Sequence, residues 1–305
     1  MTASDVFIQQ VINGLTIGMI YALIALGYTI VYGIIQLINF AHGEVFMVGA
    51  YLCLLAFSLL TGIFTGLGGS ILFLIIVFLF AMLGTAILGL VIERFGYRPL
   101  RSAPRLAPLI TAIGISFLLQ NAVMLIFGPT DKRFPTLVPI QHFSFGAVTL
   151  TNFQILISVI SLSLMVALQI FIKMTRTGKA MRALADDREA ASLVGINTNQ
   201  VIAIAFVIGS ALAGAGGVMF GMYYNTINFH DGYLAGLKAF TAAVFGGIGN
   251  IPGAMVGGLL LGVLEGVGAG YLSSEWKNVF AFLILILILL FRPSGLLGSR
   301  VVKKV

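Results

Sequence analysis

Charged residues are scarce in this sequence. Only 9% of its 305 residues are Asp, Glu, Lys or Arg, whereas 59% are hydrophobic, and the mean hydropathy is +1.09. A water-soluble domain of this size cannot cover so much apolar surface with so few charges. Apolar stretches of about 20 residues, the length that a bilayer requires of a spanning helix, recur along the whole chain. The sequence therefore predicts an all-α polytopic membrane protein with a single transmembrane domain over residues 1–305.

Cysteine is nearly absent, and basic residues are missing from the first part of the chain. Cys53 is the single cysteine, which excludes an internal disulfide and a metal site built from several cysteines. The first basic residue is Arg94. Because a secretory signal needs a basic region ahead of its apolar core, we expect the N-terminal segment to remain as a helix. The net charge of +7 comes from residues that flank apolar segments, so we expect no nucleic-acid partner.

Motifs for catalysis are lacking too. The sequence contains no Gly-x-x-x-x-Gly-Lys-Ser/Thr loop, so the chain is not expected to hydrolyse ATP by itself. No Ser-His-Asp arrangement and no pair of carboxylates in an apolar pocket can be placed. His42 and Glu44 offer too few ligands for a metal ion. We therefore predict a protein that is not an enzyme and that has no metal or cofactor of its own.

The apolar stretches and the basic residues between them predict a topology. The stretches run over 6–33, 40–61, 71–92, 106–127, 151–172, 200–221, 252–271 and 276–291, with an ambiguous Gly-rich piece at 236–249. Basic residues cluster at 94–105, 173–188 and 292–304, and the positive-inside rule places all three clusters in the cytoplasm. We predict eight or nine membrane segments, an outside N-terminus, a cytoplasmic C-terminus and a periplasmic loop over 128–150, where three prolines favour turns or short strands.

Glycine interrupts the apolar region 236–271. The basic clusters before and after this region are both predicted to be cytoplasmic, and the stretches 200–221 and 276–291 already supply one crossing in each direction. Residues 236–271 must therefore add no net crossing, either as a re-entrant hairpin or as a short span followed by a full one. In "FGGIGNIPGA", residues 245–254, the glycines, Asn250 and Pro252 predict a broken helix. Broken helices at membrane depth are tolerated where they meet protein or line an aqueous path. Small residues at spacings of three and four also allow close helix packing, so both explanations stay open.

One short loop holds an unusual density of charge. Between Lys173 and Glu189, eight of seventeen residues are charged, which places the loop 173–199 outside the bilayer. Its pattern predicts a short amphipathic helix that Gly195 ends, with Asn197 or Thr198 as the cap of the next span. Lys179, Arg182, Asp186 and Glu189 share its polar face, and Met181, Leu184 and Ala185 lie on another. Such a helix is either a solvated loop or a docking surface for a cytoplasmic partner.

Several stretches resemble one family of transporters. "EAASLVGI" (189–196) is similar to the E-A-A-x-x-x-G loop of ABC-importer permeases. The stretches 21–51 and 238–262, "IERFGYRPLR" and "RPSGLLG" resemble the permease subunits of bacterial branched-chain amino-acid importers of the LivH type. In that family the loop forms a coupling helix that enters a cleft of the ATPase subunit. The resemblance implies the same role here for Arg182, Asp186, Asp187, Arg188, Glu189, Ala190, Ala191 and Gly195.

The resemblance also implies partners, location and substrate. The chain would form half of a pore in the bacterial inner membrane, with a second permease subunit that is identical or different. Cytoplasmic ABC ATPase subunits would bind the ATP, and a periplasmic binding protein would deliver leucine, isoleucine or valine. One alternative is a related permease for urea or short amides. Another is an ion-coupled secondary transporter, which we disfavour because Glu44 and Glu265 both lie near the predicted ends of apolar segments.

Polar residues within the apolar segments are the candidates for a pathway or gate. The predicted topology puts "NFAHGE" at the cytoplasmic end of the second segment, where Asn39 can cap the helix and Glu44 suits its first turn; a gate or latch that includes His42 is the alternative. Gln120 and Asn121 either hold helices together or line a path. Glu265 is expected at the membrane interface. The candidates for the pathway or gate are Asn39, His42, Glu44, Gln120, Asn121 and Asn250.

Overall fold

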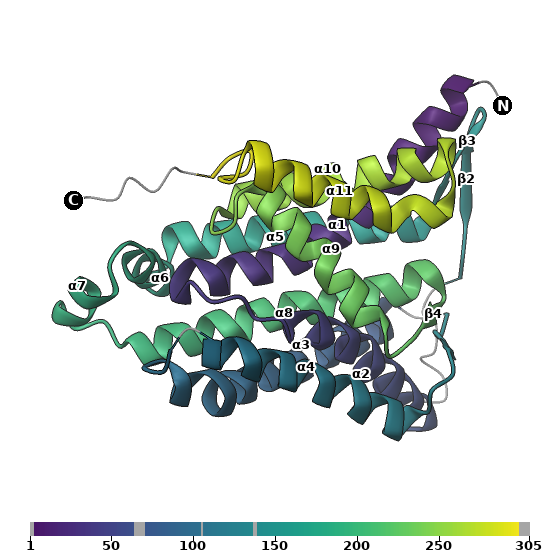
Figure 1. The fold of residues 1–305 in the computed structure, drawn as a ribbon. Coiled ribbons are helices and arrows are strands. Elements are labelled where there is room, and N and C mark those ends of the chain that lie inside the picture. Colours follow the sequence, from purple (N-terminus) through teal and green to yellow (C-terminus); the bar gives the residue numbers. More distant parts are fainter. Residues whose placement is uncertain (1–2, 64–70, 105, 137–138, 299–305) are drawn as a thin grey trace.

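The computed structural model describes residues 3–63, 71–104, 106–136 and 139–298. Arg105, residues 137–138 of the predicted outer loop, and the basic residues Arg300, Lys303 and Lys304 lie outside this range. Seven described helices are long and apolar enough to cross a membrane, and α11 (Lys277–Phe291) is a shorter apolar helix. Figure 1 shows most of the long helices lying side by side as one bundle. The seven are α1 (Ala3–Ile35), α2 (His42–Ile63), α3 (Ile71–Val91), α4 (Leu106–Phe127), α5 (Asn152–Met174), α8 (Thr198–Tyr224) and α10 (Ile251–Tyr271).

Shorter helices connect the long ones. A π-helical turn η1 (Ile92–Tyr97) and a 3-10 turn η2 (Arg98–Leu100) continue α3, and η3 (Ser274–Trp276) precedes α11. Between α5 and α8 lie α6 (Arg176–Asp186) and α7 (Arg188–Leu193). Figure 1 shows α6 and α7 at the end of the bundle opposite the N-terminus, with α7 projecting beyond the long helices. We call this the α7 end of the molecule.

Four short strands among the described residues lie at the opposite end. β1 (Lys132–Arg133) pairs antiparallel with β4 (Thr226–Ile227), and β2 (His142–Phe145) pairs with β3 (Val148–Thr151). A two-residue turn joins β2 to β3, and its first residue, Gly146, has a φ of +64°, which a side chain would disfavour. The prolines of the 128–150 region thus accompany turns and short strands, as the sequence predicts.

Helix α1 forms the centre of the bundle. Most of its second half is buried, and it packs along α10 and α8. In the α1–α10 contact, Gly14 and Gly18 face Gly258 and Gly262, and a methyl group added to Gly262 would overlap the backbone of Gly18. Small residues four positions apart let two backbones approach closely, which is a main source of helix association in lipid. Close packing therefore explains these glycines.

The connection from α1 to α2 turns back into the bundle. Gln36 ends the helix with a φ of +53°, and the chain then returns so that the His42 ring lies 4.7 Å from the Tyr28 ring, centroid to centroid. His42 also contacts Gly27, which precedes the last residue of α1 by eight positions, or about 12 Å of helix. Helix α2 therefore begins well inside the bundle. The turn that the sequence places at the cytoplasmic end of the second segment is thus buried among neighbouring helices.

The Gly-rich region forms a short helix followed by a long one. Helix α9 (Asp231–Gly246) has 16 residues, about 24 Å, and it packs against α10. Between them Gly247 and Gly249 have φ values of +106° and +91°. The chain after α11 covers this break, because Leu296 and Leu297 donate backbone hydrogen bonds to Phe245 and Gly246 at the end of α9. The predicted interruption at 245–254 is present, and it lies at the α7 end (Figure 1).

Candidate functional site

The charged loop between α5 and α8 folds as two helices, where the sequence predicts one. Asp187 separates them: its backbone is extended, and its carboxylate accepts hydrogen bonds from the backbone N–H groups of Glu189 and Ala190, each at 2.9 Å. Asp is among the best residues at this position, because its side chain satisfies N–H groups that the first helical turn leaves free. The prediction of a single helix is therefore wrong, because Asp187 ends α6 and caps α7 where the sequence pattern suggested one continuous helix.

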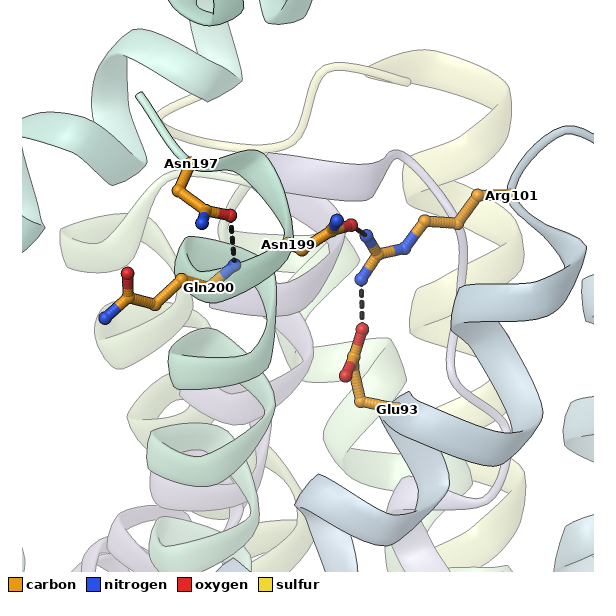
Figure 2. Close-up of polar contacts among 5 residues, drawn as sticks. All are labelled: Glu93, Arg101, Asn197, Asn199 and Gln200. Carbon is orange, nitrogen blue, oxygen red and sulfur yellow. Dashed lines mark hydrogen bonds and ion pairs between the residues drawn. The ribbon is translucent and has the colours of Figure 1, made fainter. Parts of the chain in front are cut away.

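The end of α7 confirms the role expected of Gly195. Gly195 has a φ of +85°, and its N–H donates to Ser192 O at 3.1 Å while Ile196 N–H donates to Ala191 O at 3.1 Å. This pair of bonds is a Schellman motif, which requires the left-handed conformation that glycine adopts easily. Asn197 then caps α8 by accepting from Gln200 N–H at 3.1 Å (Figure 2). Six residues of helix are thus fixed at both ends.

In the loop formed by α6 and α7, one set of side chains is buried against the bundle and another set is exposed. Met181, Leu184 and Ala191 are buried, whereas Ala185, which the pattern assigns to the apolar face, is exposed. Arg182 donates to Ile172 O at 2.7 Å and so ties α6 to the end of α5. At the tip of α7, Leu193 and Val194 are 87% and 77% exposed. Of the four motif positions, Glu189, Ala190 and Gly195 are exposed and Ala191 is buried. The other candidate coupling residues, Arg182, Asp186, Asp187 and Arg188, are exposed as well.

A polar bridge joins the start of α8 to the chain that follows α3. Figure 2 shows the Arg101 guanidinium between Glu93, with which it forms an ion pair, and Asn199, whose Oδ1 accepts from Nη1 at 2.6 Å. Burial lowers the pKa of Arg101 and the Glu93 carboxylate opposes this change, and a guanidinium remains charged in either case. Arg101 therefore links Asn199 in the first turn of α8 to Glu93 in η1.

A large cavity opens at the α7 end of the bundle. Its volume is about 820 Å³, and its walls come from the ends of α1 and α5, from α6, from the α9–α10 break and from the chain after α11. Arg182, Asp186 and Asn250 line it. Asn250 also caps α10 by accepting from Gly253 N–H at 3.0 Å, and its amide donates to Leu297 O at 2.6 Å. The Asn250 side chain thus holds the break in shape beside the cavity.

The residues of "NFAHGE" are buried. Asn39, His42 and Glu44 are each at most 3% exposed. Asn39 accepts from Ala41 N–H at 3.1 Å and from the Tyr97 hydroxyl at 3.2 Å, so it organises the turn before α2 and does not cap the helix, which begins at His42. Glu44 lies in the first turn of α2, as expected. The depth of this turn, however, removes the explanation that these groups simply meet water at the surface.

Glu44 and Gln120, which are far apart in the sequence, meet at one small cavity. We call it the Glu44 cavity; its volume is about 90 Å³, and it lies between the start of α2, the middle of α4 and the first half of α9. Glu44 accepts from the Ser116 hydroxyl at 3.3 Å, and the Gln120 amide lies 2.8 Å from His230 Nδ1. Asn121 bonds to Phe117 O of its own helix and does not line this cavity. The cavity is lined by Tyr28, Phe40, Glu44, Ile113, Ser116, Phe117, Gln120, Gly232, Tyr233, Gly236 and Leu237.

Sequence reasoning missed an ion pair inside the bundle. Lys238 on α9 and Glu265 on α10 are in contact at 2.7 Å, with side chains 10% and 1% exposed. Glu265 is therefore not at the membrane interface, and the expectation is wrong. A basic and an acidic residue, each alone in neighbouring apolar segments, would have been the signal. Because Glu44 and Glu265 are both buried deeply, their position no longer argues against an ion-coupled transporter.

Metal chemistry has no support in the described part of the chain. No three His, Cys, Asp or Glu side chains converge there as ligands. The site instead consists of an exposed helix at the α7 end, a large cavity beside it, and a small polar cavity within the bundle.

The relatives of this chain are transport proteins. Residues 10–289 match the family described as the permease component of branched-chain amino acid transport systems. The chain belongs to this family. The permease is 52% identical over 304 residues to the high-affinity branched-chain amino acid transport system permease protein BraD of Pseudomonas aeruginosa, and 48% identical over 307 residues to the LivH permease protein of Escherichia coli K12. Both alignments cover 98% of each chain.

A more distant relative has a similar description. The permease is 28% identical over 295 residues to a probable branched-chain amino acid transport permease of Methanocaldococcus jannaschii. No solved structure matches the permease. Seven long apolar helices together with membership in a permease family identify a multi-pass membrane protein. Family membership assigns the protein to the transport permeases. The buried charges alone did not distinguish between classes of transporter.

Proposed function

We propose that this permease forms half of the pore of an ATP-driven importer for branched-chain amino acids in the bacterial inner membrane. The observation that carries the proposal is 48–52% identity over 98% of the chain to permeases of that transport system. Relatives matched at full length and high identity favour leucine, isoleucine and valine over urea or short amides. A second permease subunit, identical or different, would complete the pore, and a periplasmic binding protein would deliver the substrate.

The second part of the proposal is that α7 couples the pore to a separate cytoplasmic ATPase. Three features support it: a short helix fixed at both ends, an exposed apolar tip at Leu193 and Val194, and the position of α7 beyond the long helices (Figure 1). A rigid element can transmit displacement between two bodies, whereas a mobile loop cannot. The Arg101 bridge offers the route by which α7 would act on α3 through α8 (Figure 2).

The third part is topology. With α7 in the cytoplasm, basic residues such as Arg94, Arg98, Lys173 and Arg176 lie on the same side, in agreement with the positive-inside rule. Helix α9 then enters from the outside and α10 returns, which gives nine membrane segments, an outside N-terminus and a cytoplasmic C-terminus. The buried Lys238–Glu265 ion pair supports insertion of α9 into the bundle.

Co-purification tests the coupling proposal. The permease, extracted from its native membrane in mild detergent, is expected to retain a P-loop ATPase in stoichiometric amount. Glu189→Lys reverses a charge on the exposed face of α7, and Gly195→Asp places a side chain at φ +85°. Both variants should lose the ATPase and transport while keeping the wild-type amount of protein in the membrane. ATPase retention and normal uptake in both variants would remove the coupling role from α7.

A further inference from the structure

A carboxylate with one unpaired oxygen lies at the base of the Glu44 cavity. Glu44 is 1% exposed; its Oε1 accepts from Ser116, but Oε2 has no donor within the part of the chain that the structure describes. Leaving a buried charged group without a partner costs free energy, so such groups inside membrane proteins persist mainly where transport needs them. The unpaired oxygen is therefore a candidate binding group for a cation.

Ser116 and Gln120 add polar groups to the same cavity, whose lining is otherwise mainly apolar. The Gln120 amide also lies 2.8 Å from His230 Nδ1, so it brings a second polar side chain to this part of the bundle. Polar side chains on a membrane-embedded surface normally face a protein partner or a water-filled space. At about 90 Å³ the cavity exceeds by several-fold the roughly 15 Å³ that admits one water.

We propose that Glu44 binds the α-ammonium group of the amino acid as it passes through the pore. An ammonium group has three donors and no acceptor, and it matches an unpaired carboxylate oxygen through a charge-assisted hydrogen bond. Ile113, Phe117 and Leu237 supply an apolar wall beside this oxygen. A charged head next to a branched apolar side chain is the chemistry of leucine, isoleucine and valine, so this inference rests on the proposed function.

Glycine keeps the approach to Glu44 open. A methyl group added to Gly232, in the first turn of α9, would overlap the unpaired Oε2 of Glu44. Gly114 on α4 is exposed and does not line the cavity, and a methyl group there meets nothing within 4 Å. The pair of substitutions Gly232→Ala and Gly114→Ala therefore separates an effect on the Glu44 oxygen from a general effect of alanine in a membrane helix.

Transport in proteoliposomes that contain the complete importer and its binding protein gives the first test. Glu44→Gln keeps the shape but removes the charge, and we expect it to lower leucine uptake by roughly tenfold or more, with Glu44→Asp less affected. Gly232→Ala should also lower uptake, whereas Gly114→Ala and the exposed control Glu275→Gln should not. Wild-type uptake with an unaffected Glu44→Gln would overturn this inference and leave the proposed function intact. Absence of ATP-dependent leucine uptake by the wild type would overturn both.

Thiol modification gives a test that does not depend on turnover. In a Cys53→Ala chain, Ile113→Cys places a thiol on the wall of the cavity. We expect a primary-ammonium methanethiosulfonate reagent to react faster than a sulfonate one, and Glu44→Gln to remove the difference. In the full complex, leucine should slow the reaction, but isocaproate, which is leucine without its amino group, should not. Equal protection by both compounds, or a reagent preference that survives Glu44→Gln, would contradict ammonium binding at Glu44.

Discussion

At the scale of single residues, the Lys238–Glu265 ion pair shows how a charge is accommodated within the bundle. The two side chains are in contact at 2.7 Å, and the Lys238 Nζ also lies 5.8 Å from the centre of the Tyr21 ring. Two ions that are removed from water together lose solvation but recover part of it through their attraction, whereas one ion left alone recovers none. The pair therefore joins α9 to α10 only while both members are present.

This reasoning predicts an asymmetry between single and double substitutions. Lys238→Met should destabilise the permease by about 3–5 kcal/mol, because it leaves Glu265 charged and buried without its partner. Lys238→Met combined with Glu265→Gln should recover most of that loss. Thermal unfolding of the detergent-solubilised variants measures both, with Lys277→Met, at a half-buried position away from the pair, as the control. A double variant as unstable as the single one would show that the contribution of the pair is not electrostatic.

At the scale of elements, two different causes place glycines in the helices. In the α1–α10 contact they remove side chains so that backbones can touch, whereas at Gly195, Gly247 and Gly249 they permit a positive φ where a helix ends or breaks. The first kind depends on a partner helix and the second on the local backbone alone. A substitution should therefore fail for different reasons at the two kinds of position.

The helix contact can be tested directly. Gly262→Val should separate α1 from α10, because even a methyl group at this position overlaps Gly18, and overpacking of this kind typically costs about 1–3 kcal/mol. Gly114→Val, at a position with free space, is the matched control. The readout is the temperature at which each purified variant loses its monodisperse elution profile. An equal loss in the two variants would mean that helix propensity, and not the α1–α10 contact, sets the effect.

At the scale of the whole molecule, topology is the first prediction. In a Cys53→Ala chain, Ser144→Cys on the β2–β3 hairpin should react with a membrane-impermeant reagent added to intact cells stripped of their outer membrane. Ser192→Cys on α7 should react only after the membrane is opened, since both positions are exposed but at opposite ends of the molecule (Figure 1). Labelling of Ser192→Cys from outside would invert the assignment of the cytoplasmic face.

The parts of this molecule that the sequence predicts well are those set by local chemistry. Apolar length predicts the long helices, and Gly195 and Asn197 mark helix boundaries through bonds within a few residues. The burial of the α1–α2 connection was not predicted, because nothing in the sequence near Gln36 signals that the chain returns into the bundle. The contacts that fix its depth, from Tyr28 and Tyr97, come from distant positions.

The candidate site likewise has a part that the sequence predicts from local features and a part that only the packing of the bundle reveals. The exposed α7 residues could be named from a motif, because the loop is a continuous segment. The Glu44 cavity could not, because α2, α4 and α9 each contribute a few residues and only the packing of the bundle brings Glu44, Gln120 and Gly232 together. Lys238 was overlooked for a related reason: the two lone charges stand in separate segments, and only the packing of α9 on α10 shows that they lie opposite each other.

The central claim is that ATP drives leucine through a pore of which this permease is half. The most direct test is uptake of radiolabelled leucine into proteoliposomes that contain the permease with its co-purified subunits and binding protein, in the presence of ionophores. We predict uptake that requires ATP on the α7 side, is insensitive to ionophores and is lost with Glu189→Lys. Uptake that proceeds without ATP and stops when the ion gradient is dissipated would contradict the account.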